Sequence, residues 1–295
     1  MPIVLVEGYK IHKIFLTTYY IYMMNWYRIT SLMSFYYRAV TKFNVQSPFL
    51  FDFVSNVLDT DKCYYVFEKI ESQRQKLLLM KNVVNINDFG AGSRIHHSNR
   101  KKISEIAKTS ISSKSKCRIL FNLIMQHKLN SIIELGTSLG ISSSYMASTS
   151  NKANLITLEG DKTIASIAKR VHEELGLKNI SIKIGKFSET LKSSLDSFSS
   201  IDMAFIDGHH QQKPTLEYFD MIASKCHNDS VIVIDDIRWS QEMNVAWNTI
   251  IHKPEVTLSI DLYDIGIIFL KKELSKEKIT YIPYHLKPWR IGLFG

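Results

Sequence analysis

The pattern of hydrophobic positions divides the chain into two parts near residue 130. In the first part, apolar residues recur every three to four positions, which is typical of amphipathic helices. The segment "SPFLFDFVSNVL" (47–58) has Ser47 at the N-cap position, Pro48 at the first helical position, and apolar side chains on one face. Similar helical patterns occupy residues 64–80 and 117–127. We therefore expect residues 33–115 to form a helical cap or arm beside a larger domain.

After residue 130 the pattern changes to short apolar runs separated by helical stretches. This alternation predicts βαβ units and a parallel sheet, and hence an α/β fold. The runs are "SIIEL", "NLITLEG", "ISIKIG", "IDMAFIDG" and "VIVIDDI". Two further runs, at residues 255–263 and 266–273, lie too close together for a crossover helix. They are expected to form an antiparallel hairpin at the edge of the sheet.

The two ends of the chain are predicted to lie outside the α/β domain. Residues 1–32 contain the apolar, tyrosine-rich stretch "KIHKIFLTTYYIYMMNWYR", which is too short to span a bilayer and is followed by no cleavage site of small residues. We expect it to be either disordered or an extra helix, with folded structure beginning near Met33. Residues 273–295 are expected to form a C-terminal tail.

Composition narrows the functional classes. The chain has 295 residues, 45% of them hydrophobic, and a formal net charge of +9. Its lysines and arginines are spread along the sequence without a long basic block, which favours a solvated surface over a nucleic-acid partner. Cys63, Cys117 and Cys226 are odd in number and lack a CxxC spacing, so they indicate neither a disulfide framework nor a zinc site. A reducing cytoplasm fits this cysteine usage.

Two glycine-containing turns follow apolar runs, and the residues after them distinguish their roles. After "IELGTSLGIS" (133–142) come a helical stretch and a second strand ending at Glu159, which is the order that a nucleoside-binding site requires. After "NDFGAGS" (87–93) there is only a polar, basic segment. The downstream turn is therefore the predicted cofactor site. The upstream residues, Asp88, Gly90, Gly92 and Arg94, form either a plain tight turn or a cap loop offering N–H groups to an anion.

The spacing of the downstream turn disfavours a dinucleotide. From Glu134 the pattern is E-x-G-x-x-x-G, not the GxGxxG that packs a helix against a pyrophosphate, which argues against an NAD-dependent oxidoreductase. The acid precedes the turn, where it can meet an ammonium group. S-adenosylmethionine is a nucleoside with a charged amino-acid end and no phosphates, so it is the predicted cofactor.

Four motifs in this order give the chain a family resemblance. "IELGTSLGIS", "TLEGD", "IDMAFIDGHH" and "VIVIDDIRWS" resemble those of class I S-adenosylmethionine-dependent methyltransferases, in particular the cation-dependent O-methyltransferases of the catechol and caffeoyl-CoA type, within a bacterial branch. The resemblance covers residues 116–272. It implies a Rossmann-like sheet of seven strands with the last strand antiparallel, helices on both faces, and N-terminal helices closing the substrate side.

The resemblance also implies the residues that hold the cofactor. The methionyl moiety would be held by Glu134, Gly136, Thr137, Ser138 and Gly140. Glu159, followed by Gly160, would accept hydrogen bonds from the two ribose hydroxyls, and Asp207 would also lie beside the cofactor. Lys186 departs from the acceptor expected near adenine, so Ser188 is the predicted contact there.

Acidic residues after two neighbouring strands are the predicted catalytic centre. Asp207, Asp235 and Asp236 match the family's magnesium ligands, although Asp236 replaces an asparagine. A hard cation there would neutralise them and lower the pKa of a substrate hydroxyl. His209 and His210 stand where the family has a catalytic lysine, and either imidazole could act as general base or ligate manganese.

Two tryptophans and an arginine follow the acidic residues in the sequence. Trp239 and Trp247 are eight residues apart and are expected to pack on one helical face, and Arg238 either pairs with Asp236 or holds an anionic substrate. We expect an O-methyltransferase that acts on a small hydroxylated molecule and pairs as a homodimer. Methylation of RNA or protein, and a methyltransferase fold that binds without catalysing, stay open as alternatives.

Overall fold

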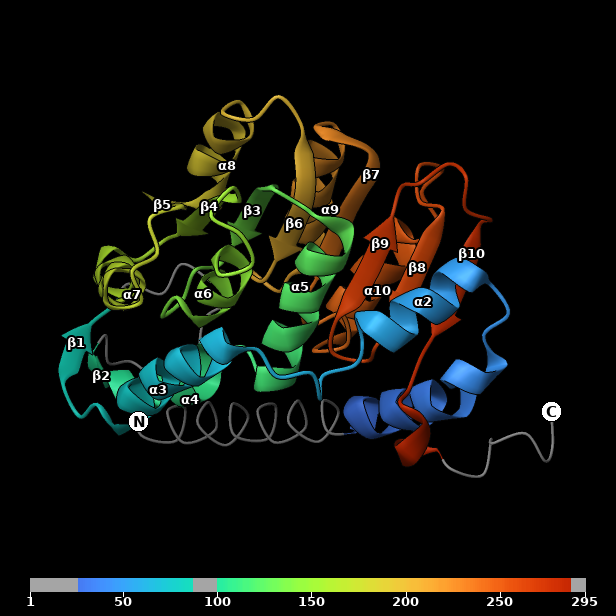
Figure 1. The fold of residues 1–295 in the computed structure, drawn as a ribbon, viewed down its shortest axis with the longest axis horizontal. Helices are drawn as coiled ribbons and strands as arrows, with labels where there is room; N and C mark the ends of the chain where they lie inside the picture. Colours follow the sequence, from blue (N-terminus) through green and yellow to red (C-terminus); the bar gives the residue numbers. More distant parts are fainter. Residues whose placement is uncertain (1–25, 87–99, 288–295) are drawn as a thin grey trace, which may run out of the picture.

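The computed structural model describes residues 26–86 and 100–287 (Figure 1). Residues 26–38 are helical. The remaining elements of the N-terminal part are η1 (Lys42–Asn44), α2 (Pro48–Asn56), α3 (Tyr65–Leu79), β1 (Val83–Asn85), β2 (Arg100–Lys102), α4 (Ile103–Ser110) and α5 (Lys114–His127). The strands that follow are β3 (Ser131–Leu135), β4 (Asn154–Glu159), β5 (Ile180–Ile184), β6 (Ile201–Ile206), β7 (Cys226–Ile234), β8 (Leu258–Asp261), β9 (Gly266–Phe269) and β10 (Glu277–Thr280). The helices between and after them are α6 (Ile141–Ala147), α7 (Lys162–Glu174), α8 (Phe187–Leu195), α9 (Gln212–Ala223), α10 (Gln241–Ile250) and η2 (Tyr284–Leu286).

The helices predicted before residue 130 are present. Ser47 caps α2, because its hydroxyl accepts a hydrogen bond from the Leu50 N–H at 3.4 Å. Helix α5 begins at Lys114, three residues before the predicted start, because Ser113 caps it. The described part of the N-terminal extension, residues 26–32, belongs to a helix that runs through Met33, where we had expected folded structure to begin. The upstream glycine turn, with Asp88, Gly90, Gly92 and Arg94, lies outside the described residues.

The central sheet has eight strands in the order β10-β8-β9-β7-β6-β3-β4-β5. Strands β5, β4, β3, β6 and β7 pair in parallel, and β9 is antiparallel to both β7 and β8. These seven strands have the predicted arrangement. The eighth strand, β10, pairs in parallel with β8. The β8–β9 hairpin therefore does not form the edge, and residues 277–280, which we assigned to a tail, belong to the sheet.

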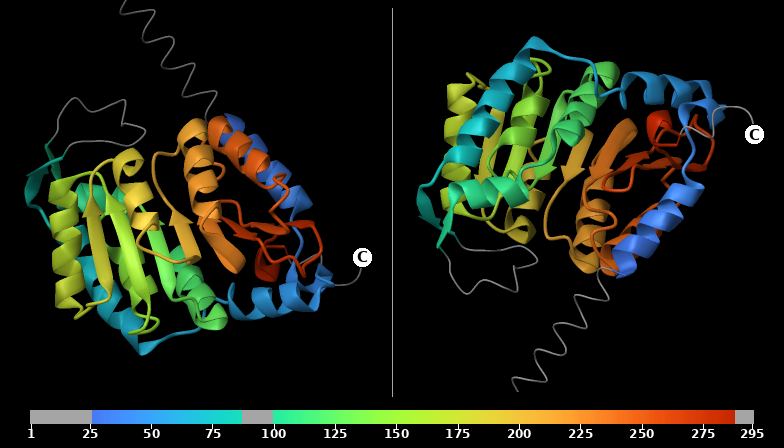
Figure 2. Two further views of the ribbon diagram at one scale, coloured as in Figure 1. Left: turned by 90° about the horizontal axis from the view of Figure 1, so that it is seen from above. Right: turned by 90° about the horizontal axis from the view of Figure 1, so that it is seen from below.

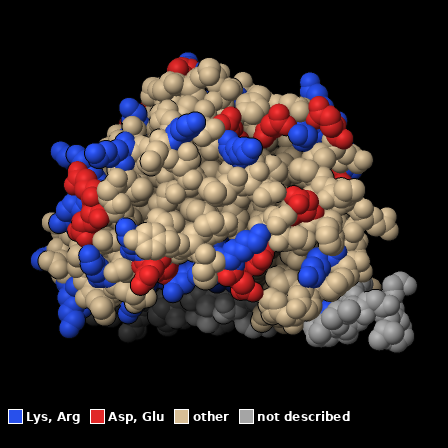
Figure 3. All heavy atoms as spheres, viewed as in Figure 1, with Lys and Arg blue, Asp and Glu red and all other residues tan. Residues whose placement is uncertain are grey.

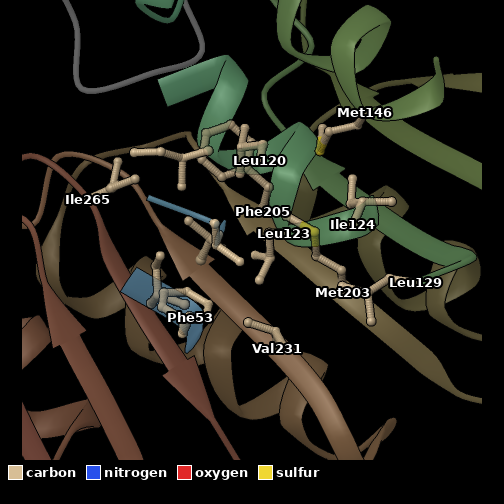
Figure 4. Close-up of a cluster of buried hydrophobic side chains, with 14 of the residues drawn as sticks. Phe53, Leu120, Leu123, Ile124, Leu129, Met146, Met203, Phe205, Val231 and Ile265 are labelled. Atoms are coloured by element: carbon tan, nitrogen blue, oxygen red, sulfur yellow. The ribbon is translucent and has the colours of Figure 1, made fainter. Parts of the chain in front are cut away.

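Alternate residues of the strands face two separate cores. Ile132 of β3 packs with α2, α5 and α6 on one face, whereas Ile133 packs with α8, α9 and α10 on the other. Figure 4 shows the first of these cores, in which Phe53 and Leu123 meet Phe205 of β6. Both faces are buried by helices (Figure 2), which explains why these strands are continuous apolar runs.

The helical cap adds a further layer on the α5 side of the sheet. Phe67 of α3 lies 4.9 Å from the ring of Phe121 in α5 and 4.9 Å from that of Tyr145 in α6, measured between centroids. Helix α4 joins the same apolar cluster through Ile103 and Ile106. This packing holds residues 111–113, which connect α4 to α5, over the carboxyl ends of the strands.

The helix at residues 26–38 is tied to the C-terminal half of the chain. The buried Arg238 guanidinium pairs with Asp261 and donates a hydrogen bond to the Ser31 hydroxyl at 3.2 Å. Phe35 and Ala39 pack with Ile282. Within residues 26–86 and 100–287, no helix combines the length and the hydrophobicity needed to cross a membrane.

Charged side chains are mixed on the surface. On the face shown in Figure 3, lysines and arginines lie among aspartates and glutamates and do not gather into one basic patch. The three cysteines are free. On this face the two signs of charge are mixed, in line with the spread of lysines and arginines along the sequence.

Candidate functional site

A cavity of about 690 Å³ opens at the carboxyl ends of the parallel strands. Residues at or after the ends of β3, β4, β5, β6 and β7 line it, together with the connection between α4 and α5. It lies where the strand order reverses around β3, whose neighbours are β4 and β6. This is the position at which open α/β sheets bind ligands.

The turn after β3 brings its backbone against the end of β6. Gly136 has a φ of +104°, and a Cβ built there would lie 2.0 Å from the Asp207 carbonyl oxygen. Only glycine fits this position, because a residue with a side chain rarely adopts this positive φ and its Cβ would collide with the Asp207 backbone. Gly140, with a φ of +81°, starts α6 and packs against His172 and Ala168 from α7. Gly136 and Ser138 line the cavity, while Gly140 supports the turn from below.

Glu159 closes one side of the cavity at the end of β4. Its carboxylate accepts hydrogen bonds from the Ser138 N–H at 3.0 Å and from the Asp161 N–H at 2.9 Å. Burial raises the pKa of Glu159, and these backbone donors oppose that shift. Gly160 and Asp161 also line the cavity. The predicted ribose-binding carboxylate is therefore beside the glycine turn.

Glu134 and Thr137 lie differently from our expectation. Glu134 is completely buried and does not line the cavity. Its two carboxyl oxygens form hydrogen bonds with Ser142 Oγ at 2.5 Å and Thr157 Oγ1 at 2.6 Å, and Thr157 Oγ1 is also hydrogen-bonded to Thr137 Oγ1. Burial raises the pKa of Glu134 to about 7. Glu134 supports the turn from beneath it, where it cannot meet an ammonium group in the cavity.

Residues after β5 and β6 also line the cavity. Lys186 and Phe187 line it, whereas Ser188, our predicted adenine contact, is exposed and does not line the cavity. A Cβ at Gly208 would lie 2.4 Å from the Phe187 ring, which explains the glycine there. An aromatic ring beside the Glu159 side of the cavity is a surface on which a base can stack.

The predicted acidic residues do meet at the other end of the cavity, but a lysine lies among them. Lys116 Nζ, from the first turn of α5, is 2.6 Å from Asp235 Oδ1 and 3.7 Å from Asp236 Oδ1. Asp207 accepts a hydrogen bond from Ser112 Oγ at 3.3 Å. Sequence reasoning missed Lys116 and Ser112, because nothing in the local pattern distinguishes them from other polar residues at a helix start.

The charges of this cluster depend strongly on one another. Burial alone would lower the pKa of Lys116, but the neighbouring Asp235, Asp236 and Asp207 together outweigh burial and raise it. Burial raises the pKa of Asp207 well above its ordinary value, and the charges of Asp235 and Asp236 add to this effect. Lys116 therefore stays protonated and offsets part of the negative charge.

The two histidines have different surroundings. The His210 ring lies between two carboxylates, with Nε2 3.7 Å from Asp207 Oδ1 and Nδ1 3.6 Å from Asp236 Oδ2. His209 Nδ1 is 2.9 Å from the Tyr218 hydroxyl, and its ring packs edge-on against Phe187. His210 is thus part of the acidic cluster, whereas His209 helps to hold the wall of the cavity.

Several residues here adopt a left-handed backbone. Ser138, His209, His210 and Asp236 have φ values of +48°, +65°, +35° and +55°. Such conformations are costly for residues other than glycine and persist where the surrounding structure enforces them, often at functional sites. All four residues line the cavity.

The predicted metal ligands do not match a divalent cation as they stand. Among the described residues, no three histidine, cysteine, aspartate or glutamate side chains are arranged as a metal site. The Lys116 ammonium also sits directly on Asp235, where a divalent cation would be repelled by it. The carboxylates of this cluster therefore suit the Lys116 ammonium group better than a magnesium or manganese ion.

The tryptophans and Arg238 differ in their roles. Trp239 precedes α10, is 49% exposed and lines the cavity beside Asp236, with the Arg28 guanidinium 4.2 Å from its ring. Trp247 is buried under Gly266, so the two rings do not share a packed helical face. Arg238 pairs with Asp261 rather than with Asp236 or a substrate.

Comparison with protein families and sequences identifies the region that contains this site. Residues 133–237 match a family described as "Methyltransferase domain". An uncharacterized protein, R132, of Acanthamoeba polyphaga mimivirus is 28% identical over 163 residues, which are 52% of this chain and 73% of that protein. The matched family region spans β3 to the end of β7 and includes the glycine turn and all three aspartates.

Solved structures show the same fold. An O-methyltransferase from Bacillus cereus in complex with S-adenosylhomocysteine superposes with a TM-score of 0.51 at 17% identity, covering 74% of this chain and 96% of that one. A methyltransferase of Podospora anserina, PaMTH1, bound to the same compound, gives 0.51 at 16% identity, with coverages of 77% and 98%. At these identities the likeness concerns the fold.

Proposed function

Because this chain carries a methyltransferase domain on the class I S-adenosylmethionine-dependent fold, we propose that it transfers a methyl group from S-adenosylmethionine to a hydroxyl of a small molecule. One observation carries the proposal. A single cavity is lined at one end by Glu159 and the Gly136 turn and at the other end by the Asp207, Asp235 and Asp236 cluster. The proposed cofactor site and the proposed acid–base site would therefore lie in one cavity, as methyl transfer requires.

The residues beside the turn suit the parts of this cofactor. The Glu159 carboxylate can accept hydrogen bonds from two adjacent ribose hydroxyls, and Phe187 lines the same cavity. The cofactor's ammonium group would lie beside Gly136, at the point where the turn meets the Asp207 backbone. When bound, the cofactor supplies an electrophilic methyl group on a positively charged sulfur.

The acceptor would lie between Trp239 and the acidic cluster. Trp239 offers an exposed ring at the cavity wall, which suits a flat or cyclic acceptor. His210, held between Asp207 and Asp236, is placed to accept the proton of the acceptor hydroxyl. His209, which bonds to Tyr218, is left with a supporting role.

Both bound homologues named above hold S-adenosylhomocysteine, and this supports the choice of cofactor. A bacterial origin, a cytoplasmic location and a homodimer stay predictions. The mixed charge of the face in Figure 3 supports a small acceptor over RNA.

Calorimetric titration of the chain with S-adenosylhomocysteine tests the cofactor, with NAD as the control ligand. We expect micromolar binding of the first and none of the second. Binding of NAD alone, or of neither ligand, would refute the proposal.

A second assay tests the acceptor class. The chain is incubated with S-adenosylmethionine labelled on its methyl group and, in separate reactions, with phenols, hydroxylated ring compounds, total RNA or a protein extract. Label is expected in the small molecules. Label recovered only in RNA or protein would contradict the small-molecule assignment while leaving the cofactor assignment intact.

A further inference from the structure

The acidic cluster contains its own positive charge, supplied from a distant part of the chain. Lys116 belongs to α5, whereas Asp235 and Asp236 follow β7. Lys116 and Asp235 are 119 residues apart in the sequence. We propose that Lys116 takes the place of a divalent cation in this site, so that its ammonium group neutralises the aspartates and stabilises the acceptor oxyanion during methyl transfer. This inference rests on the proposed function and departs from the cation dependence that the sequence resemblance implied.

The geometry of Lys116 resembles that of a central ion rather than of a surface ion pair. Its Nζ contacts Asp235 at 2.6 Å and Asp236 at 3.7 Å, and its side chain is only 17% exposed. Asp235 is more deeply buried, with a side chain 4% exposed. A buried carboxylate in such a cluster needs a positive partner, and the ammonium provides it.

The lysine still faces the cavity. Lys116 lines it together with Asp207, Asp235 and Asp236, and the charges of all three aspartates act on its pKa. An ammonium group has three N–H donors, so a donor stays available for an acceptor oxygen beside the two carboxylates. Lys116 therefore has the position of a catalytic residue, in direct reach of the acceptor.

The backbone that carries Lys116 is anchored by the cap. The Lys116 N–H donates to the Ser113 hydroxyl at 3.3 Å, and Arg74 Nη1 of α3 donates to the Ser112 carbonyl at 2.7 Å. Arg74 is in turn held by Glu71 at 2.9 Å. These contacts fix the start of α5, so the ammonium is preorganised over the aspartates and does not depend on a mobile loop.

The reaction is balanced without a metal. An oxygen lone pair of the acceptor forms the new bond to the methyl carbon, and the bond between this carbon and the sulfonium sulfur breaks, with its electron pair returning to sulfur. The hydroxyl proton passes to His210 and then to water. Lys116 keeps its protons throughout and stabilises the negative charge that develops on the acceptor oxygen.

Titration of manganese into the complete chain tests the proposal without an activity assay. The free Mn²⁺ signal in electron paramagnetic resonance is followed for the wild-type chain and for Lys116→Met, Lys116→Arg and Lys114→Met. Lys114 is the matched control, because its ammonium pairs with Glu71 and it lies on the same helix turn. We expect the wild type, Lys116→Arg and Lys114→Met to bind manganese at least 10-fold more weakly than Lys116→Met, in which the aspartates lose their internal cation.

The wild-type titration decides the question even if Lys116→Met does not fold. Stoichiometric micromolar binding of manganese by the wild type, lost in Asp235→Asn, would overturn the proposal. Once an acceptor is known, turnover should be unchanged by a chelator and should fall by about 100-fold or more in Lys116→Met, as expected for the loss of a preorganised charge.

Binding of S-adenosylhomocysteine is measured on every variant. If the wild type binds S-adenosylhomocysteine but also binds manganese tightly, only the proposed role of Lys116 is refuted, and the proposed function is not. Loss of binding in the wild type itself would refute the proposed function, whatever the manganese result.

Discussion

Gly136 lies so close to Asp207 that a methyl group on its Cα would be 2.0 Å from the Asp207 carbonyl oxygen. Two strands, β3 and β6, therefore meet at the point where the glycine turn begins and the acidic cluster ends. This contact links the two ends of the cavity, because Gly136 belongs to the cofactor side and Asp207 to the acceptor side.

We predict that Gly136→Ala both destabilises the chain and abolishes binding of S-adenosylhomocysteine. The new methyl group meets backbone atoms, which cannot move aside as a flexible side chain would. Gly176→Ala is the matched control, since Gly176 also has a positive φ (+71°) but its added Cβ would meet nothing within 4 Å. The control should lose only about 1 to 2 kcal/mol of stability and retain binding. Denaturant unfolding and calorimetry measure both, and equal effects of the two substitutions would argue against the Asp207 contact as the cause.

Glu159 and Asp235 are expected to separate binding from turnover. Glu159→Ala should abolish binding of S-adenosylhomocysteine, because the carboxylate that faces the ribose position is lost. Asp235→Ala should change this binding little but remove turnover, because Asp235 lies at the acceptor end with Lys116. Glu255→Ala, at an exposed position after α10, controls for the loss of a carboxylate. Equal loss of cofactor binding in the Glu159 and Asp235 variants would contradict this division.

Glu134 should make stability depend on pH. Its pKa is raised from 4.5 to about 7 by burial, so between these values the unfolded chain ionises Glu134 while the folded chain keeps it protonated. The contribution of Glu134 to stability is therefore fully present below pH 4.5, falls as the pH rises through this window, and is lost above pH 7. Glu134→Gln removes this loss. The free energy of unfolding of the variant relative to wild type should therefore rise by roughly 3 kcal/mol between pH 4.5 and pH 8.

Urea unfolding of both proteins across this pH range, without cofactor, measures the difference. Glu255→Gln serves as the control for an exposed glutamate. A difference between wild type and Glu134→Gln that does not change with pH would show that Glu134 is ionised in the folded chain.

The buried pair between Arg238 and Asp261 should matter more for stability than an exposed pair. Arg238→Leu leaves the Asp261 carboxylate buried and removes the bond to Ser31, so we expect a loss of about 3 to 5 kcal/mol. Lys271→Leu breaks the exposed pair with Asp229 and should cost less than about 1 kcal/mol. Urea denaturation compares the two variants. Similar losses would mean that the Arg238 contacts contribute little to holding the helix at residues 26–38.

Local patterns were sufficient to predict most of the fold. Strands buried on both faces require continuous apolar runs, and "SIIEL" and "IDMAFI" could not be solvated helices or loops. Strand β10 escaped prediction because "EKIT" is short and only partly buried, so its sequence has no strong pattern. Its place in the sheet is determined by pairing with β8.

The residues of the site also divide into those that local patterns predict and those that they do not. Glu159, Asp207 and Asp235 could be predicted because each follows a strand, and the carboxyl ends of parallel strands meet along one edge. Glu134 and Ser188 could not be placed correctly, because whether a side chain near a strand end faces the cavity depends on packing around it. Glu134 is covered by Ser142 and Thr157, and Phe187 rather than Ser188 turns toward the cavity.

By itself, the sequence determined the order of strands and helices, the glycine turn and the acidic residues at the strand ends, because hydrophobic periodicity and turn chemistry act between neighbouring residues. The tertiary structure alone decided that Lys116 lies among those acids. Its contact with Asp235 joins residues 119 positions apart, through the packing of the cap against α5, and an ion pair of this kind leaves no trace in the local pattern. The charge at the centre of the site was therefore visible only after the chain had folded.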